Sequence, residues 1–214
     1  MNSQGMSDVM RSIVSVLQTP VIAVLLLMLA VSVVFIGIAL VEWLVERRHL
    51  QVNMPALMDD LKGASDSADM RARINASGLL ESQKKVLANL TEHPEFTERE
   101  REALAIRLLE QEQARYDLRI TWTNVLSKLA PMFGLMGTLI PLGPGLIALG
   151  QGDTQTLSNS LLIAFDTTVT GLIAAALAVL VSTARKRWYK NYMTMLESLE
   201  ELVLEEEAGR AGKK

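Results

Sequence analysis

Polar side chains that could do chemistry gather inside an apolar stretch of the C-terminal half. Residues 164–172 carry one carboxylate and three hydroxyls, which belong to Asp166, Thr167, Thr168 and Thr170. An aspartate within a membrane-spanning helix costs about 2.5 to 3.5 kcal/mol on insertion, so Asp166 is expected to face protein or water and not lipid. Asp166 and Thr170 are four residues apart and share one face of a helix.

A second apolar stretch contains small and kinking residues beside another hydroxyl. Small residues let helices approach closely, and prolines leave carbonyl groups that must find partners in protein or water. The positions predicted for helix packing or kinking are Gly134, Gly137, Pro141 and Pro144 in this stretch, and Gly171 in the stretch of residues 164–172.

The two stretches bring hydroxyl groups to a similar depth. A turn centred near Asp153 places Thr138 and Thr168 each about 15 residues away along antiparallel helices. The pattern therefore predicts a polar pore lining made by Thr138, Asp166, Thr167, Thr168 and Thr170. Two alternatives stay open: a threonine hydroxyl can bond back to a carbonyl of its own helix, and the carboxylate can make a helix–helix hydrogen bond.

Two nearly uncharged regions contain three apolar blocks, and the polar residues above lie in the second and third blocks. Half of the 214 residues are hydrophobic and only 5% are aromatic, yet the charged residues are almost absent from two regions of the chain. Residues 20–41 contain no charge, and at about 1.5 Å per residue they cross a hydrocarbon core of about 30 Å. This first block is too long for a signal-peptide core and lacks a small-residue cleavage site, so it is interpreted as a retained helix. The predicted fold class is an all-α integral membrane protein with three transmembrane helices and long cytoplasmic helical extensions.

The basic residues predict the orientation of the three spans. Arg47, Arg48 and Lys128 flank the long loop, and four basic residues follow the third span between positions 185 and 190. By the positive-inside rule, the loop and the C-terminus are cytoplasmic and the N-terminus is outside the plasma (inner) membrane. The predicted segments are an extracytoplasmic N-terminal segment (1–19), transmembrane helix 1 (20–45), a cytoplasmic helical loop (46–124), transmembrane helix 2 (125–149), an extracytoplasmic turn (150–156), transmembrane helix 3 (157–183), and a cytoplasmic C-terminal helix and tail (184–214).

The cytoplasmic loop is predicted to be helical, with two interruptions. Residues 66–69 and 93–95 break the helix, and residues 97–100 fit a capping box that opens a new one. An alternating spacing of four and three residues predicts a stripe that packs on a neighbouring helix. Its members are Leu104, Leu108, Gln111, Arg115, Leu118, Trp122, Val125 and Leu129.

Composition argues against several function classes. The net charge is −3, and the 13 basic and 13 acidic residues of positions 47–128 balance one another, so no nucleic acid partner is predicted. The chain has no cysteine and only two histidines, so no metal site or cofactor is predicted. An intramembrane enzyme would need a nucleophile with a base, and a transporter would need more spans or an internal repeat. Neither class is favoured, and the chain is not predicted to be an enzyme.

Two motifs resemble those of a known family of membrane proteins. Residues 130–138 read Ala-Pro-x-x-Gly-Leu-x-Gly-Thr, and residues 168–172 read Thr-x-x-Gly-Leu. Together with the order of one span, a long helical loop and a two-span hairpin, they resemble the MotA/TolQ/ExbB proton channel family. The resemblance assigns the family's pore threonines to Thr138 and Thr168. Where the ExbB and TolQ branch has a glutamate this chain has Ile163, and Asp166, nearly one turn further on, is the candidate substitute.

The resemblance implies a motor stator. Family members form a ring, a pentamer in the well-studied branches, with span one outside and spans two and three around a pore. A single-span membrane partner similar to ExbD, TolR or MotB occupies that pore and carries the proton-binding aspartate. The driven process, such as protein transport, is left open, as is the choice between protons and sodium. The competing hypothesis is a non-conducting membrane anchor or scaffold whose cytoplasmic helices oligomerise or bind a soluble partner.

Overall fold

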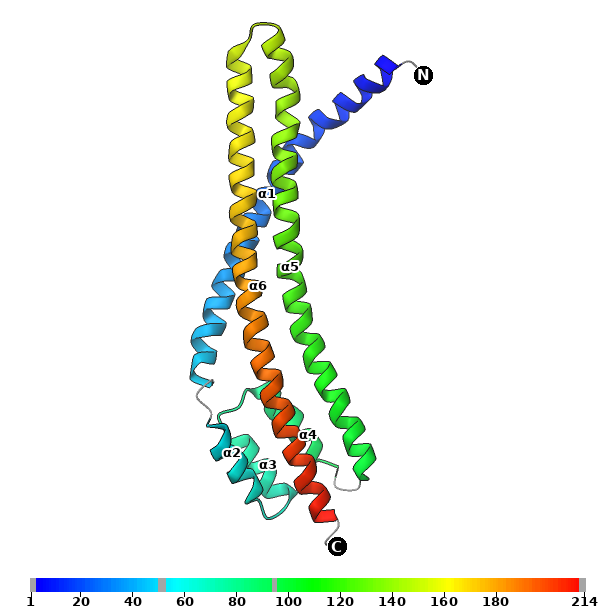
Figure 1. The fold of residues 1–214 in the computed structure, drawn as a ribbon, viewed down its shortest axis with the longest axis vertical. Helices are drawn as coiled ribbons and strands as arrows, with labels where there is room; N and C mark the ends of the chain where they lie inside the picture. Colours follow the sequence, from blue (N-terminus) through cyan, green and yellow to red (C-terminus); the bar gives the residue numbers. More distant parts are fainter. Residues whose placement is uncertain (1–2, 50–52, 94–95, 212–214) are drawn as a thin grey trace. The chain divides into compact units, whose positions relative to one another are not determined.

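The computed structural model is all-α, as the sequence predicts. It describes residues 3–49, 53–93 and 96–211, and within these ranges it contains six helices and no strand. The helices are α1 (Ser3–His49), α2 (Met54–Lys62), α3 (Ser67–Ala76), α4 (Glu81–Thr91), α5 (Glu98–Gly150) and α6 (Thr154–Ala211), labelled in Figure 1. Three of them, α1, α5 and α6, contain stretches long and apolar enough to cross a membrane.

The chain divides into two compact units that share these three long helices. The first unit comprises Met1–Ala39 and Ile120–Ala184, and the second comprises Leu40–Arg119 and Arg185–Lys214. The first unit therefore holds most of the apolar stretches, and the second holds α2, α3 and α4.

In the first unit, α5 and α6 form an antiparallel hairpin (Figure 1). Gly152 has a φ of +83°, a left-handed conformation that glycine adopts at little cost, and Asp153 N–H donates to the Ala148 carbonyl at 2.9 Å. The Asp153 carboxylate then accepts from the backbone N–H of Thr156 at 3.0 Å and caps α6. Hydrogen bonds from Thr156 hold the pKa of Asp153 below its usual value. The turn thus closes through residues 151–153.

In the second unit, α2, α3 and α4 share one apolar core with the first part of α5 and the last part of α6. Fully or nearly fully buried members of this core include Leu61, Met70, Ile74, Leu87, Leu90, Leu199 and Val203. Arg71 donates to the Thr91 carbonyl at 2.8 Å, and Gln83 donates to the Tyr192 carbonyl at 3.2 Å. Buried apolar area and these cross-helix bonds together hold α3, α4 and α6 in place.

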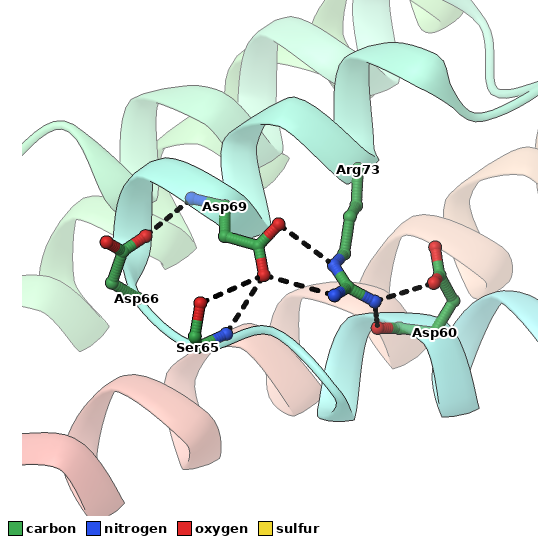
Figure 2. Close-up of polar contacts among 5 residues, drawn as sticks. All are labelled: Asp60, Ser65, Asp66, Asp69 and Arg73. Carbon is green, nitrogen blue, oxygen red and sulfur yellow. Dashed lines mark hydrogen bonds and ion pairs between the residues drawn. The ribbon is translucent and has the colours of Figure 1, made fainter.

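Figure 2 shows the corner between α2 and α3, where the sequence predicts the first interruption. Asp66 caps α3 by accepting from the backbone N–H of Asp69 at 2.6 Å. The Asp69 carboxylate accepts from Arg73 and from both polar groups of Ser65, and Arg73 also pairs with Asp60 at 2.7 Å. The Arg73 hydrogen bond, followed by that of the Ser65 N–H, lowers the pKa of Asp69 to about 2. The corner is built from local polar bonds.

The second predicted interruption falls at His93, Pro94 and Glu95, of which positions 94 and 95 lie outside the described residues. The predicted capping box is confirmed. Thr97 N–H donates to the Glu100 carboxylate at 2.9 Å, and Glu100 N–H donates to the Thr97 hydroxyl at 3.4 Å. The new helix, α5, begins at Glu98.

The predicted packing stripe of α5 is wrong over its second half. Leu104 and Leu108 pack against the core, but Leu118 is 63% exposed and Trp122 is 67% exposed. The buried face is set instead by small and polar residues, which allow close approach to a neighbouring helix: Ala105, Glu112, Thr123 and Ala130. Apolar periodicity does not separate a face buried in the protein from one that faces lipid or another molecule.

Glu200 makes stability depend on pH in the second unit. Its side chain is buried, and Oε1 has no hydrogen-bond partner. Burial, and then the charge of Glu197, raise the pKa of Glu200 from 4.5 to about 7. An unfolded chain thus releases this proton at lower pH than the folded one, so stability falls as pH rises from about 4.5 to about 7 and stays reduced above that.

We expect Glu200→Gln to flatten this decline and to raise the melting temperature above pH 7. Glu197→Gln should give a smaller change in the same direction, because it removes only the secondary cause. Thermal melts of the detergent-solubilised protein between pH 4.5 and 8, followed by circular dichroism, measure the effect. The exposed Glu110→Gln variant is the control, and an unchanged slope in Glu200→Gln would contradict the assignment.

Candidate functional site

The candidate site lies on the α5–α6 hairpin, whose two helices touch through glycines. A Cβ atom at Gly171 would lie 2.7 Å from the Ala130 carbonyl oxygen and 3.0 Å from the Gly134 Cα. A Cβ atom at Gly137 would lie 2.6 Å from the Thr167 Cβ. Because there is no room for a side chain at these contacts, the helix backbones approach closely. The contact fixes which residues face inward and which face outward.

Thr167 points into the hairpin. Its side chain is 6% exposed, lies against Gly137, and donates to the carbonyls of Ile163 and Ala164 at 2.9 and 3.0 Å. This placement differs from the predicted pore lining. Gly137 of α5 has no side chain, and the side chain of Thr167 on α6 occupies the space that this leaves.

Thr138 and Thr168 lie on one outer face of the hairpin. Gly137 and Thr167 face each other, and two antiparallel helices are related by a twofold axis perpendicular to the plane that contains them. Positions that follow the facing pair on each helix therefore point to the same side. Thr138 and Thr168 both follow it by one residue, and both are partly exposed. Their levels differ by about two residues, or roughly 3 Å.

Asp166 and Thr170 lie on the opposite face. Asp166 precedes the facing pair by one residue, so it points away from the side that carries Thr168. Ile140 lies on the same side as Thr170 by the same symmetry, and it is buried against Val21 and Leu25 of α1. Asp166 is nevertheless exposed. The single polar surface predicted from the sequence is thus divided between two faces, and α1 packs on the face of Asp166.

The threonine hydroxyls donate hydrogen bonds to carbonyls of their own helices, which is the alternative that the sequence leaves open. Thr138 donates to the Leu135 carbonyl at 2.7 Å, and Thr168 donates to the Ala164 carbonyl at 3.0 Å. Thr170 donates to the Asp166 carbonyl at 2.7 Å. A hydroxyl whose proton is engaged in this way still has acceptor lone pairs. The face of Thr138 and Thr168 can therefore accept hydrogen bonds from an outside group.

Two prolines add backbone acceptors near Thr138. Helix α5 continues through Pro141 and Pro144. Proline has no N–H, so the carbonyls of Gly137 and Ile140, four residues earlier, lose their usual helix donor. These carbonyl oxygens lie within one turn of the Thr138 hydroxyl along the helix.

Two buried contacts that tie α1 to the hairpin are not predicted from the sequence. In the first unit, the fully buried Ser32 donates to the Ala174 carbonyl at 3.0 Å. In the second unit, Arg185 is 4% exposed and donates to the Glu42 carboxylate at 3.0 Å, and Arg119 lies 3.6 Å from the other oxygen of Glu42. The sequence feature that could have indicated this ion pair is the position of Glu42 just after the first apolar block and of Arg185 just after the third.

Comparison with known proteins identifies a family for the part of the chain that holds the α5–α6 hairpin. None of the curated proteins matches the chain closely enough to count as a relative. The family model described as MotA/TolQ/ExbB proton channel family matches residues 68–198, which include α5 and most of α6. This family consists of ion-driven, stator-type channel subunits that assemble with a partner membrane protein. The chain is therefore a multi-pass membrane protein that belongs to the MotA/TolQ/ExbB proton channel family.

Proposed function

We propose that this chain is the ring-forming subunit of a proton-driven stator, which couples ion flow to mechanical work through a single-span partner similar to ExbD, TolR or MotB. The observation that carries the proposal is the outer face of the hairpin that presents Thr138 and Thr168. It is a polar surface at mid-span, opposite the face on which α1 packs. A polar surface in a membrane requires water or a partner group.

The chemistry of this face suits a moving proton carrier. The hydroxyls of Thr138 and Thr168 donate hydrogen bonds to backbone carbonyls. Their oxygen atoms can therefore accept hydrogen bonds from water, hydronium or a protonated carboxyl group. Such weak neutral acceptors stabilise a passing donor without binding it tightly. Each proton moving through 100 mV supplies about 2.3 kcal/mol.

In a ring of copies, the hairpin face of Thr138 and Thr168 and the hairpin face of Asp166 point to different surroundings. If Thr138 and Thr168 face a central pore, α1 lies on the outside, which is the arrangement that the family resemblance implies. We take the ring to be a pentamer in the plasma (inner) membrane. The Glu42–Arg185 pair supports placing the loop and the C-terminus on the same side of the membrane, because it joins the ends of the first and third spans. The N-terminus and the turn at residues 151–153 then lie outside.

Asp166 takes a different role in this arrangement. It is exposed on the face away from Thr168, where lipid would be unfavourable, so we assign it to a contact with a helix of the neighbouring copy. There it forms a helix–helix hydrogen bond, in agreement with the structural alternative left open by the sequence. Thr170 lies one turn from it on the same face.

Proton flux into proteoliposomes tests the function. The purified complex with its partner is reconstituted, a potassium diffusion potential is imposed, and an internal pH-sensitive dye reports proton entry. The proposal expects entry that depends on the partner and on the potential. A scaffold would give the background rate of protein-free vesicles in every condition.

The same vesicles separate the two roles of Asp166. Asp166→Asn keeps a hydrogen-bonding side chain, so we expect near wild-type flux and the wild-type particle mass by native mass spectrometry. Asp166→Leu removes the bond and should lower the assembled fraction several-fold. A large loss of flux in Asp166→Asn with an intact particle would place Asp166 in the ion pathway instead.

A further inference from the structure

The hairpin face that presents Thr138 and Thr168 carries hydrogen-bonding groups at a second level. Asn124 lies 14 residues before Thr138 on α5, and Ser182 lies 14 residues after Thr168 on α6. Fourteen residues are close to four helical turns, or about 21 Å, so each residue returns to nearly the same side of its helix. This second level lies at the end of the hairpin away from the turn at residues 151–153, which the proposed orientation places toward the cytoplasm.

The contact between α5 and α6 supports the shared side. Thr123 is 0% exposed and Val181 is 4% exposed, so the residues that directly precede the second level are buried. The Ser182 hydroxyl donates to the side-chain oxygen of Asn124 at 2.6 Å, across the two helices. Asn124 and Ser182 thus each follow a buried position by one residue, which is the relation that the two threonines have to their own facing pair.

Asn124 presents a hydrogen-bond donor at this level. The bond from Ser182 engages the amide oxygen and leaves the NH₂ group to donate elsewhere. In the part of the chain that the structure describes, this NH₂ group has no acceptor, and the residue is partly exposed. Ser182 is 3% exposed, so it acts on the pathway only by positioning the amide. The accessible polar group of the second level is therefore the Asn124 amide.

Ser127 and Pro131 connect the two levels along α5. They lie 11 and seven residues before Thr138, close to three and two helical turns, and both are partly exposed. The Ser127 hydroxyl donates to the Asn124 carbonyl at 2.8 Å, and its oxygen can still accept. The Ser127 carbonyl loses its usual helix donor, because Pro131 has no N–H. Within a membrane, such a carbonyl needs a partner from protein or water.

We propose that Asn124 and Ser127 bind a single file of hydrogen-bonded water molecules that carries protons between the level of Thr138 and the cytoplasm. The inference rests on the proposed function, because it takes the threonine face to line an ion pathway. In this water file a hydronium ion passes one proton to the next water and becomes water itself, so the protein only holds oxygen atoms in place. The Ser127 oxygens accept from water, and the Asn124 amide donates to the water nearest the cytoplasm. Lipid chains on this face would leave the same groups without partners.

Cysteine accessibility tests the water file without relying on transport. The sequence has no cysteine, so Ser127→Cys and Leu129→Cys each introduce a single thiol. Leu129 lies at nearly the same depth but on another side of α5. The complex with its partner is placed in lipid nanodiscs, where both membrane surfaces are accessible, and a charged, membrane-impermeant thiosulfonate is added. Ser127→Cys should react about tenfold faster or more, because only a hydrated thiol forms the reactive thiolate. Equal rates at the two positions would overturn the water file.

Proton flux in the proteoliposome dye assay separates this inference from the proposed function. Ser127→Ala removes a hydroxyl that bonds within α5 and should lower partner-dependent flux about threefold, whereas Asn124→Leu should lower it about tenfold or more. Ser182→Ala breaks the same interhelical bond but keeps the amide, so it should lower the melting temperature as Asn124→Leu does and the flux much less.

The outcomes of the two assays are distinct. Background flux in the wild type would contradict the proposed function, and the cysteine rates would still report whether water reaches Ser127. Partner-dependent flux that persists in full in Asn124→Leu and Ser127→Ala would overturn the water file alone. Equal losses of flux in Asn124→Leu and Ser182→Ala, in proportion to their melting temperatures, would also overturn it, since the Asn124–Ser182 bond would then serve helix packing only.

Discussion

Gly171→Ala is expected to destabilise the protein, whereas Gly37→Ala in α1 is expected to stabilise it slightly. A methyl group at Gly171 would lie 2.7 Å from the Ala130 carbonyl oxygen and 3.0 Å from the Gly134 Cα, both backbone atoms. Neither atom can move without separating α5 from α6, and overpacking of this kind costs about 1 to 3 kcal/mol. At Gly37 nothing lies within 4 Å and no proline follows, so alanine gains up to about 1 kcal/mol of helix propensity.

The two variants form a matched pair for this test. Both change one glycine to alanine within a membrane-spanning stretch, so lipid exposure and helix propensity are comparable. Thermal melts of the purified complex in one detergent should move in opposite directions for the two proteins. Melting temperatures that rise together would show that the helices are not in contact at Gly171.

The sequence predicted the three apolar helices and the caps at Asp66 and Thr97 for local physical reasons, but it missed the break at residues 77–80 between α3 and α4. A block of 22 uncharged residues has few other stable environments than a membrane, and Asp66 and Thr97 cap helices through bonds to residues only three positions away. The family also followed from short motifs, because the close glycine contact of α5 with α6 permits few residue types at Gly134 and Gly171. These features depend on a few neighbouring positions.

The division of the polar residues between two faces could not be predicted in the same way. Spacing along one helix shows that Asp166 and Thr170 share a face, but it does not show which face meets α5. That choice depends on the facing of Gly137 and Thr167, a contact between residues 30 positions apart in the chain. Similarly, Leu118 and Trp122 fit an apolar stripe, yet close packing selected the small residues on another side of α5. Long-range packing decides such alternatives, and hydropathy alone does not.

The largest functional effect is expected from removing the hydroxyls of the proposed pore face. Thr138→Val and Thr168→Val keep the shape of the side chain and delete the acceptor oxygen. A hydrogen bond to a charged group contributes about 1.5 to 3 kcal/mol, so each variant should slow partner-dependent proton flux roughly 10- to 150-fold. The proteoliposome dye assay measures this rate directly.

Assembly should survive both substitutions, because in the described part of the chain each hydroxyl bonds to a carbonyl of its own helix and not to another helix. The particle mass is therefore expected to stay that of the wild type. Thr183→Val, at an exposed position near the end of the third apolar stretch, is the matched control and should keep full flux. Thr167→Val offers a sharper comparison, since its hydroxyl lies inside the hairpin against Gly137 and cannot reach a carrier on the outer face. If Thr167→Val stops proton entry while Thr138→Val and Thr168→Val do not, then the ion pathway does not run along the face assigned to it.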